Sequence, residues 1–122
     1  MIQVGTKVKI TDNSGGKIGQ VFKVLGGSKR RYAALGDVVV LSVKTAEPRK
    51  LVKKKDVLRG VVVRQKKSTR RRDGSYIRFD DNAVVILEKG KEPKAARIFG
   101  PIPREIQEQG YQTIASNAPE VI

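Results

Sequence analysis

The densest group of chemically active side chains is a run of cations at residues 64–72, RQKKSTRRR. Six of these nine residues are Lys or Arg, none is acidic, and Asp73-Gly74 follows directly. Like charges at this density repel one another, so the run gives an isolated chain no stability. Arginine forms paired hydrogen bonds with phosphate oxygens. A single-signed, arginine-rich run therefore indicates binding to a polyanion such as RNA.

The residue types on which most catalysis depends are scarce. The sequence has no histidine and no cysteine, which excludes Ser-His-Asp and Cys-His nucleophiles and the common zinc sites. Four acids, Asp73, Asp80, Asp81 and Glu88, could in principle hold Mg²⁺ for a nuclease. A turn at Asp73 and a strand flanked by Asp80-Asp81 explain them more simply. We therefore expect no enzymatic activity, no metal and no cofactor.

Further segments are candidates for contact with phosphates. Residues 26–28 are Gly-Gly-Ser, which lets the backbone approach a phosphate, and cations follow at 29–31. Tyr32 suits either base stacking or ordinary packing, and Asn13-Ser14 suits either a turn or an RNA contact. The candidate RNA-binding residues are Asn13, Ser14, Lys29, Arg30, Arg31, Tyr32, Lys53, Lys54, Lys55, Arg64, Lys66, Lys67, Arg70, Arg71, Arg72 and Arg78.

The overall charge points to the same class of partner. The chain has 122 residues, 39% of them hydrophobic and 31% charged, with a net charge of +14. One domain of this length buries a real core without a disulfide or a metal. Residues 29–72 carry nearly all the excess charge, whereas 73–122 are close to neutral. This asymmetry predicts one surface for a polyanion and another for a different partner.

Targeting signals also shape our expectations. The sequence has no long apolar run and no signal-peptide pattern at its start. We therefore expect no membrane partner. The absence of cysteine favours a reducing compartment, and we expect a cytoplasmic location.

Hydrophobic patterning predicts a mainly β fold. Strands are expected at 6–10, 17–25, 37–45, 57–64 and 82–87, separated by glycine-rich turns and loops. Five such strands predict a single domain, 1–122, built as a small five-stranded antiparallel β-barrel. Several strands are apolar on successive residues, so a cap or partner should cover part of the outer surface. Gly19 suggests a bulge.

Two features should project from or cover this barrel. Asp73-Gly74 is typical of a tight turn, so residues 64–75 should form a projecting basic β-ribbon. Prolines at 101 and 103 and Gly110 bracket a short helix over 101–110, and a second turn of helix is expected within 111–116. The C-terminal segment, 101–117, is therefore short and helical.

The few aromatic residues bear on how RNA would be bound. Phe22, Phe79 and Phe99 lie among aliphatic residues, and we expect them in the core. RNA binding would then depend on phosphate and shape contacts rather than on base stacking. Neutralising six phosphates would give a log–log slope of affinity against salt of about −4 to −5.

One stretch resembles a family signature. Gly60-Val61-Val62-Val63, nine residues, Asp73-Gly74, then Phe79, Asn82 and Val85-Ile86 match the pattern of the bacterial-type large-subunit ribosomal protein fourteen family. The likeness continues through MIQV, DNSGG, KVLGGSKRRYA, GDVV, RIFGP and APEVI, and so covers the whole chain. Family members commonly read RRPDGS at the hairpin tip, where this sequence reads RRDGS.

The resemblance implies a structural, non-catalytic constituent of the large ribosomal subunit that binds large-subunit ribosomal RNA. It implies neighbours in large-subunit ribosomal proteins nineteen and three, and a bridge to small-subunit RNA across the subunit interface. It also implies docking of the ribosomal silencing factor. The residues expected to make these protein and bridge contacts are Arg97, Arg104, Ser116 and Asn117.

Two other functions remain open on the residues alone. A free basic β-barrel, such as an RNA chaperone or translation factor, would carry the same charge. A nuclease would need Asp80 or Asp81 for cleavage. Sedimentation with the large subunit at moderate salt separates the ribosomal function from that of a free barrel. Cleavage of RNA that is abolished by replacing Asp80 or Asp81 would support the nuclease.

Overall fold

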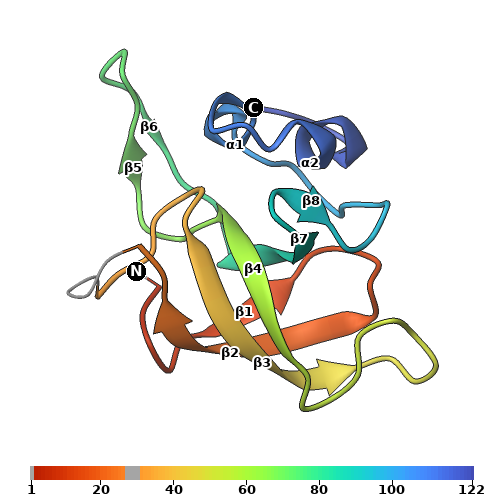
Figure 1. The fold of residues 1–122 in the computed structure, drawn as a ribbon. Helices are drawn as coiled ribbons and strands as arrows, with labels where there is room; N and C mark the ends of the chain where they lie inside the picture. The colour runs from red at the N-terminus through yellow and green to blue at the C-terminus, as the bar shows by residue number, and fades with distance from the viewer. Residues whose placement is uncertain (1, 27–30) are drawn as a thin grey trace.

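Five long strands form the centre of the protein. The computed structural model describes residues 2–26 and 31–122 (Figure 1). The strands agree with the expected ranges to within two residues, and they are β1 Lys7–Ile10, β2 Gly16–Val24, β3 Val38–Ala46, β4 Val57–Arg64 and β7 Ala83–Lys89. The shorter elements are β5 Thr69–Arg70, β6 Tyr76–Ile77, β8 Glu92–Pro93, α1 Arg104–Glu108 and α2 Gln112–Asn117.

The sheet closes on itself as a barrel. Its order is β1-β2-β3-β4-β7-β8, and β1 also pairs with β7, through Lys9↔Ala83 and Ile10↔Val84. This closing pair is parallel, whereas the prediction was purely antiparallel. The reason is geometric: five strands that each run opposite to the last leave the first and fifth pointing the same way. The barrel is therefore mixed.

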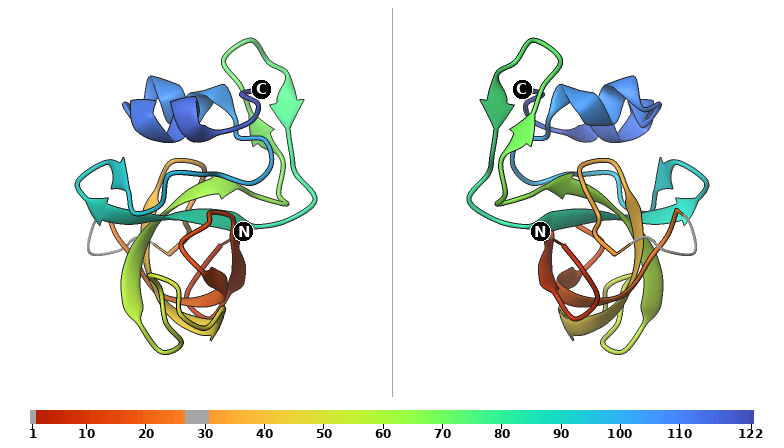
Figure 2. Two further views of the ribbon diagram at one scale, coloured as in Figure 1. Left: turned by 90° about the vertical axis from the view of Figure 1, so that its right-hand side faces the viewer. Right: turned by 90° about the vertical axis from the view of Figure 1, so that its left-hand side faces the viewer.

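Strands β4 and β7 are buried on both faces. Val62 and Ile86 point into the barrel, whereas Val61, Val63 and Val85 point outward yet are equally buried. Helices α1 and α2 cover this outer surface (Figure 2). The outer cluster consists of Val61, Val63, Ala83, Val85, Leu87, Ile98, Ile102, Ile106, Tyr111, Ile114 and Ala115. The expected cap is thus supplied by the C-terminal segment of the same chain.

Helix α1 is shorter than expected. It begins only after Pro103, whose backbone is extended, and the chain leaves it before Gly110 at φ +95°. Helix α2 follows almost at once. Both helices are too short to be stable alone, so burial of Ile106 and Ile114 against the barrel must hold them in place.

Two glycines make room for Leu41 inside the barrel. A Cβ at Gly19 would lie 2.4 Å from Leu41 Cδ1, and one at Gly60 would lie 3.0 Å from Leu41 Cδ2 and 3.3 Å from the Val85 carbonyl oxygen. The pairing of β2 with β3 shifts register between Ile18 and Gly19, which confirms the expected irregularity there. Small residues on both sides of Leu41 therefore set the spacing of the central strands.

We expect Gly60→Ala to lower the free energy of unfolding by about 1–3 kcal/mol, because the added methyl overpacks the space beside Leu41. Urea denaturation of the purified protein measures the change. Val57→Ala, at an exposed position of the same strand, is the matched control and should change stability by less. Equal stability of wild type and Gly60→Ala would contradict this account of the packing.

Candidate nucleic-acid interface

The arginine-rich run forms a hairpin that projects from one end of the barrel, beside α1 (Figures 1 and 2). Strands β5 and β6 pair through Thr69↔Ile77 and Arg70↔Tyr76. Arg64 and Gln65, at the start of the run, are buried. The rest of the run and the turn that follows it stand clear of the barrel, as the sequence predicted.

The turn at the tip is held by Asp73. Its carboxylate accepts hydrogen bonds from the backbone N–H and the hydroxyl of Ser75, at 3.0 and 2.6 Å. These bonds, chiefly that from the hydroxyl, hold the pKa of Asp73 below its usual value. Gly74 has φ +90°, which a residue with a side chain adopts only with strain. The carboxylate of Asp73, the acid that follows the basic run, thus stabilises the turn at the tip.

The three consecutive arginines of the hairpin have different environments. Arg70 and Arg72 are exposed, whereas Arg71 is largely covered. The Arg71 Nε atom lies 3.0 Å from Glu105 Oε1 on α1. This ion pair fixes the inner side of the hairpin against the helical cap. Arg70 and Arg72 are therefore the two of these three arginines whose side chains remain exposed.

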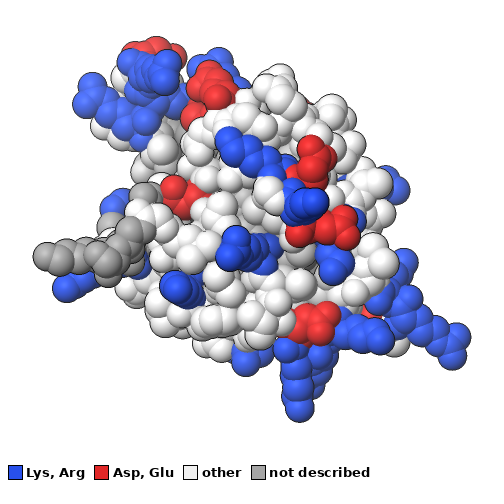
Figure 3. Space-filling model, in the orientation of Figure 1, with Lys and Arg blue, Asp and Glu red and all other residues white. Residues whose placement is uncertain are grey.

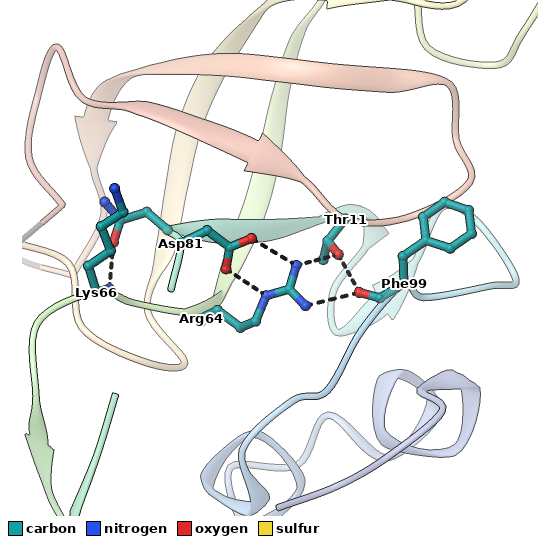
Figure 4. Close-up of polar contacts among 6 residues, drawn as sticks. Thr11, Arg64, Lys66, Asp81 and Phe99 are labelled. Carbon is teal, nitrogen blue, oxygen red and sulfur yellow. Dashed lines mark hydrogen bonds and ion pairs between the residues drawn. The ribbon is translucent and has the colours of Figure 1, made fainter. Parts of the chain in front are cut away.

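Arg64 is not available to RNA, in contrast to the prediction. Its residue is 6% exposed, and its guanidinium group bonds inside the protein (Figure 4). Nε lies 3.0 Å from Asp81 Oδ1, Nη2 lies 2.7 Å from Thr11 Oγ1, and Nη1 donates to the Phe99 carbonyl oxygen at 3.1 Å. A buried charge needs this number of partners to offset its desolvation. Arg64 is therefore a structural residue at the base of the hairpin.

Ser14 is also buried, which corrects its assignment as an RNA contact. Its hydroxyl and backbone N–H both donate to Asp12 Oδ1, at 2.5 and 3.2 Å, while Asp12 Oδ2 accepts from the Ile86 N–H. Burial raises the pKa of the Asp12 carboxyl, and these bonds oppose the rise. The turn reading was thus right for Ser14. Asn13 is exposed, although its Oδ1 accepts from the Arg97 N–H.

The other candidate RNA contacts are spread over several parts of the surface. Lys53–Lys55 occupy the β3–β4 loop at the opposite end of the barrel from the hairpin, as Figures 1 and 2 show. Lys66, Lys67, Arg78, Arg31 and Tyr32 are exposed. Lys29 and Arg30 lie outside the described residues. Figure 3 shows Lys and Arg side chains gathered at the hairpin and at the lower right, where the β3–β4 loop lies in Figure 1. Acidic and basic side chains are mixed over the helices.

The residues expected to contact proteins lie on or beside the C-terminal segment. Arg97, Arg104 and Ser116 are exposed, and Asn117 is half-buried. The Arg97 guanidinium lies over the Phe99 ring, 5.7 Å from its centroid. Arg104 borders a cavity of about 430 Å³ between the hairpin and α1. These residues are at least partly accessible, and Arg104 lies beside the basic hairpin.

Two of the three phenylalanines expected in the core are exposed. Phe22 and Phe99 each have 47% of their surface accessible, and Phe79 is half-buried. The prediction failed because both residues lie among aliphatic neighbours in sequence while pointing to the outside of the barrel. The predicted RNA contacts also did not include two exposed lysines of β1, Lys7 and Lys9. The sequence shows them alternating with Val8 and Ile10, which are buried.

Other kinds of site are not evident in the part of the chain that the structure describes. Within residues 2–26 and 31–122, no three acidic side chains come close enough to hold a metal ion. Across the same ranges, neither helix is long and apolar enough to cross a membrane.

A closed, strongly basic β-barrel with an arginine hairpin defines a class of protein, the small RNA-binding barrels. Comparison with protein families makes this specific. The family described as ribosomal protein L14p/L23e matches the chain over residues 1–122, the whole of this sequence. The chain belongs to that family. It is therefore a structural protein of the large ribosomal subunit and not a member of an enzyme family, and its place is on the ribosome in the cytoplasm.

Removing the Arg64 guanidinium should destabilise the protein strongly. We expect Arg64→Ala to lower the free energy of unfolding by about 3 kcal/mol, since it leaves Asp81 and Thr11 without their partner. Arg64→Lys should recover only part of this, because an ammonium group cannot reach three partners at once. Thermal and urea denaturation would measure both, with Lys66→Ala as the exposed-cation control. If Arg64→Ala lowered the free energy of unfolding no more than Lys66→Ala does, the structural role of Arg64 would be refuted.

Proposed function

We propose that this protein binds large-subunit ribosomal RNA mainly through the hairpin, with Arg70 and Arg72 as its leading phosphate contacts. The observation that carries the proposal is the hairpin itself, a projecting ribbon whose one acid, Asp73, accepts hydrogen bonds from Ser75, and beside which Glu105 of α1 is paired with Arg71. The secondary contacts are exposed residues away from the hairpin tip, namely Asn13, Arg31, Tyr32, Lys53–Lys55, Lys66, Lys67 and Arg78. Lys29 and Arg30 are kept as contacts on sequence grounds.

The alternative of a free RNA-binding barrel, such as a chaperone or translation factor, has less support. Membership of a large-subunit ribosomal family favours a permanent place in the particle. In addition, the helical cap offers a near-neutral surface of the kind suited to protein contacts. A tagged protein should therefore sediment with the large subunit and stay there at moderate salt, whereas a free factor would remain in the soluble fraction.

The C-terminal side is proposed to face proteins and the other subunit. Arg97, Arg104, Ser116 and Asn117 would contact ribosomal proteins nineteen and three, the small-subunit RNA at a bridge, and the ribosomal silencing factor. Support comes from their accessibility beside the cap and from the resemblance stated above. Exposed Arg97 and Ser116 are the residues assigned to the silencing factor.

Replacing Arg70 and Arg72 with Ala should weaken binding to purified large-subunit RNA about tenfold at moderate salt, with a log–log salt slope shallower by about 1.5. The barrel should stay folded, because neither side chain is buried. Filter binding across a salt series would measure both quantities.

The matched control removes two cations from elsewhere, Lys89 and Lys94, beside the helical cap. This variant has the same net charge as the hairpin variant but should keep most of the affinity. If the two variants bind RNA equally, net charge alone explains the binding and the hairpin has no special role.

Replacing Arg97 and Ser116 with Ala should weaken docking of the purified silencing factor on large subunits while sparing incorporation of the protein itself. Both side chains are exposed, so the fold should survive. Co-sedimentation of the factor with the particles measures docking. Glu120→Gln, a change at an exposed residue that follows the C-terminal segment, is the control. Normal docking of the double variant would remove these residues from the factor's binding surface.

A further inference from the structure

A second basic site lies along the seam where the barrel closes. It is a groove of about 700 Å³ between β1, the β1–β2 turn, the β3–β4 loop and the chain before β7. Five exposed lysines border it, namely Lys7, Lys9, Lys17, Lys50 and Lys66. This groove is separate from the hairpin tip, because none of the residues that line the groove belongs to the tip.

The acids in the groove leave its positive charge largely uncancelled. Asp12 is buried and accepts hydrogen bonds from Ser14 and Ile86, and Asp81 is paired with Arg64. Only Glu47 remains as an exposed carboxylate among the lining residues. Five cations facing one exposed acid form a site suited to an extended polyanion.

The arrangement of the lysines suits a strand rather than a single ion. Lys7 and Lys9 are two residues apart on the outward side of β1, which separates their Cα atoms by about 6.5 Å. That spacing resembles the distance between successive phosphates of an extended nucleic-acid strand. The pairing of β1 with β7 is confined to Lys9 and Ile10, so the seam is only partly closed beside these lysines.

An exposed aromatic ring completes the groove. The Phe99 N–H donates to the Thr11 carbonyl oxygen at 2.7 Å, and the Phe99 carbonyl accepts from Arg64. The backbone is thus fixed on both sides, while the ring points away from the Arg64 guanidinium (Figure 4) and the residue as a whole is 47% exposed. Exposed Ile18 adds a second apolar surface to the lining. The Arg97 guanidinium lies over one face of this ring, so a base would stack on the other face, with little further ordering of the ring.

We propose that this groove binds an unpaired stretch of RNA, with the lysines on its phosphates and one base stacked on Phe99. The proposal rests on the RNA-binding function proposed above and adds a second, chemically different contact to it. A duplex hides the faces of its bases, so only unpaired nucleotides satisfy both the lysines and the ring.

Two variants test the two halves of the proposal with the full-length protein and a fluorescent oligouridylate. Phe99→Leu keeps an apolar side chain but removes the stacking surface, and should weaken binding about fivefold or more without altering the salt slope. Lys7→Ala/Lys9→Ala/Lys17→Ala should make the log–log slope shallower by about 2. An RNA duplex of the same length should show no effect of Phe99→Leu.

Matched controls exist within the chain. Phe22→Leu alters a phenylalanine of equal exposure outside the groove, and Lys44→Ala/Lys89→Ala/Lys94→Ala removes three cations elsewhere. Both should bind oligouridylate as the wild type does, apart from a small general effect of charge. Thermal denaturation of every variant establishes that the folded fraction is the same.

Several outcomes would overturn the proposal. Equal effects of Phe99→Leu and Phe22→Leu, or of the two lysine triples, would show that the groove has no special role. Tighter binding of an oligoglutamate peptide than of oligouridylate, with dependence on the lysines but not on Phe99, would assign the groove to an acidic protein segment.

The hairpin variant separates this proposal from the function on which it rests. If Arg70→Ala/Arg72→Ala weakens binding to large-subunit RNA while the groove variants bind normally, the groove proposal fails and the proposed function stands. If neither the hairpin nor the groove variants lose affinity for that RNA, the proposed function itself fails.

Discussion

The arrangement of the hairpin, the barrel seam and the helical cap depends on one buried guanidinium group. Arg64 ends β4, where the chain leaves for the hairpin. It contacts Thr11 just after β1, Asp81 before β7 and Phe99 just before the C-terminal segment. Gly100 lies so close that a Cβ there would approach Arg64 Nη1 to 2.0 Å. Four chain segments therefore meet around a single charge that must keep all its partners to remain buried.

Burial of β4 and β7 on both faces gives this centre a rigid surrounding. The barrel interior lies on one side of these strands and the short helices lie on the other. Each fully buried aliphatic side chain contributes about 1.5–3 kcal/mol, so two helices of five and six residues are stable here although neither would be alone. The hairpin gains from the same arrangement, because Arg71 is anchored to Glu105 on the first of these helices.

Most of the fold could be predicted because its signals are local. Valine-rich runs and glycine-rich turns placed all five strands, and the prolines and Gly110 placed the C-terminal helices. The burial of Arg64 could not be predicted, since its hydrogen-bond partners are 17, 35 and 53 residues away in sequence. Phe99 was misplaced for a related reason. Its neighbours in sequence are apolar, but its backbone bonds to Thr11 turn the ring outward.

The same distinction explains which basic residues serve the surface. Within one run, Arg64 is buried, Arg71 is tied to a helix, and Arg70 and Arg72 are exposed, although all four are chemically identical. Composition therefore overstates the charge that reaches a partner from the hairpin. It also understates the charge along β1, where two lysines alternate with core residues and form no run. The density of positive charge in the sequence identifies the kind of partner. Which cations remain available to that partner depends on which of them the fold pairs with acids, as it pairs Arg64 with Asp81 and Arg71 with Glu105.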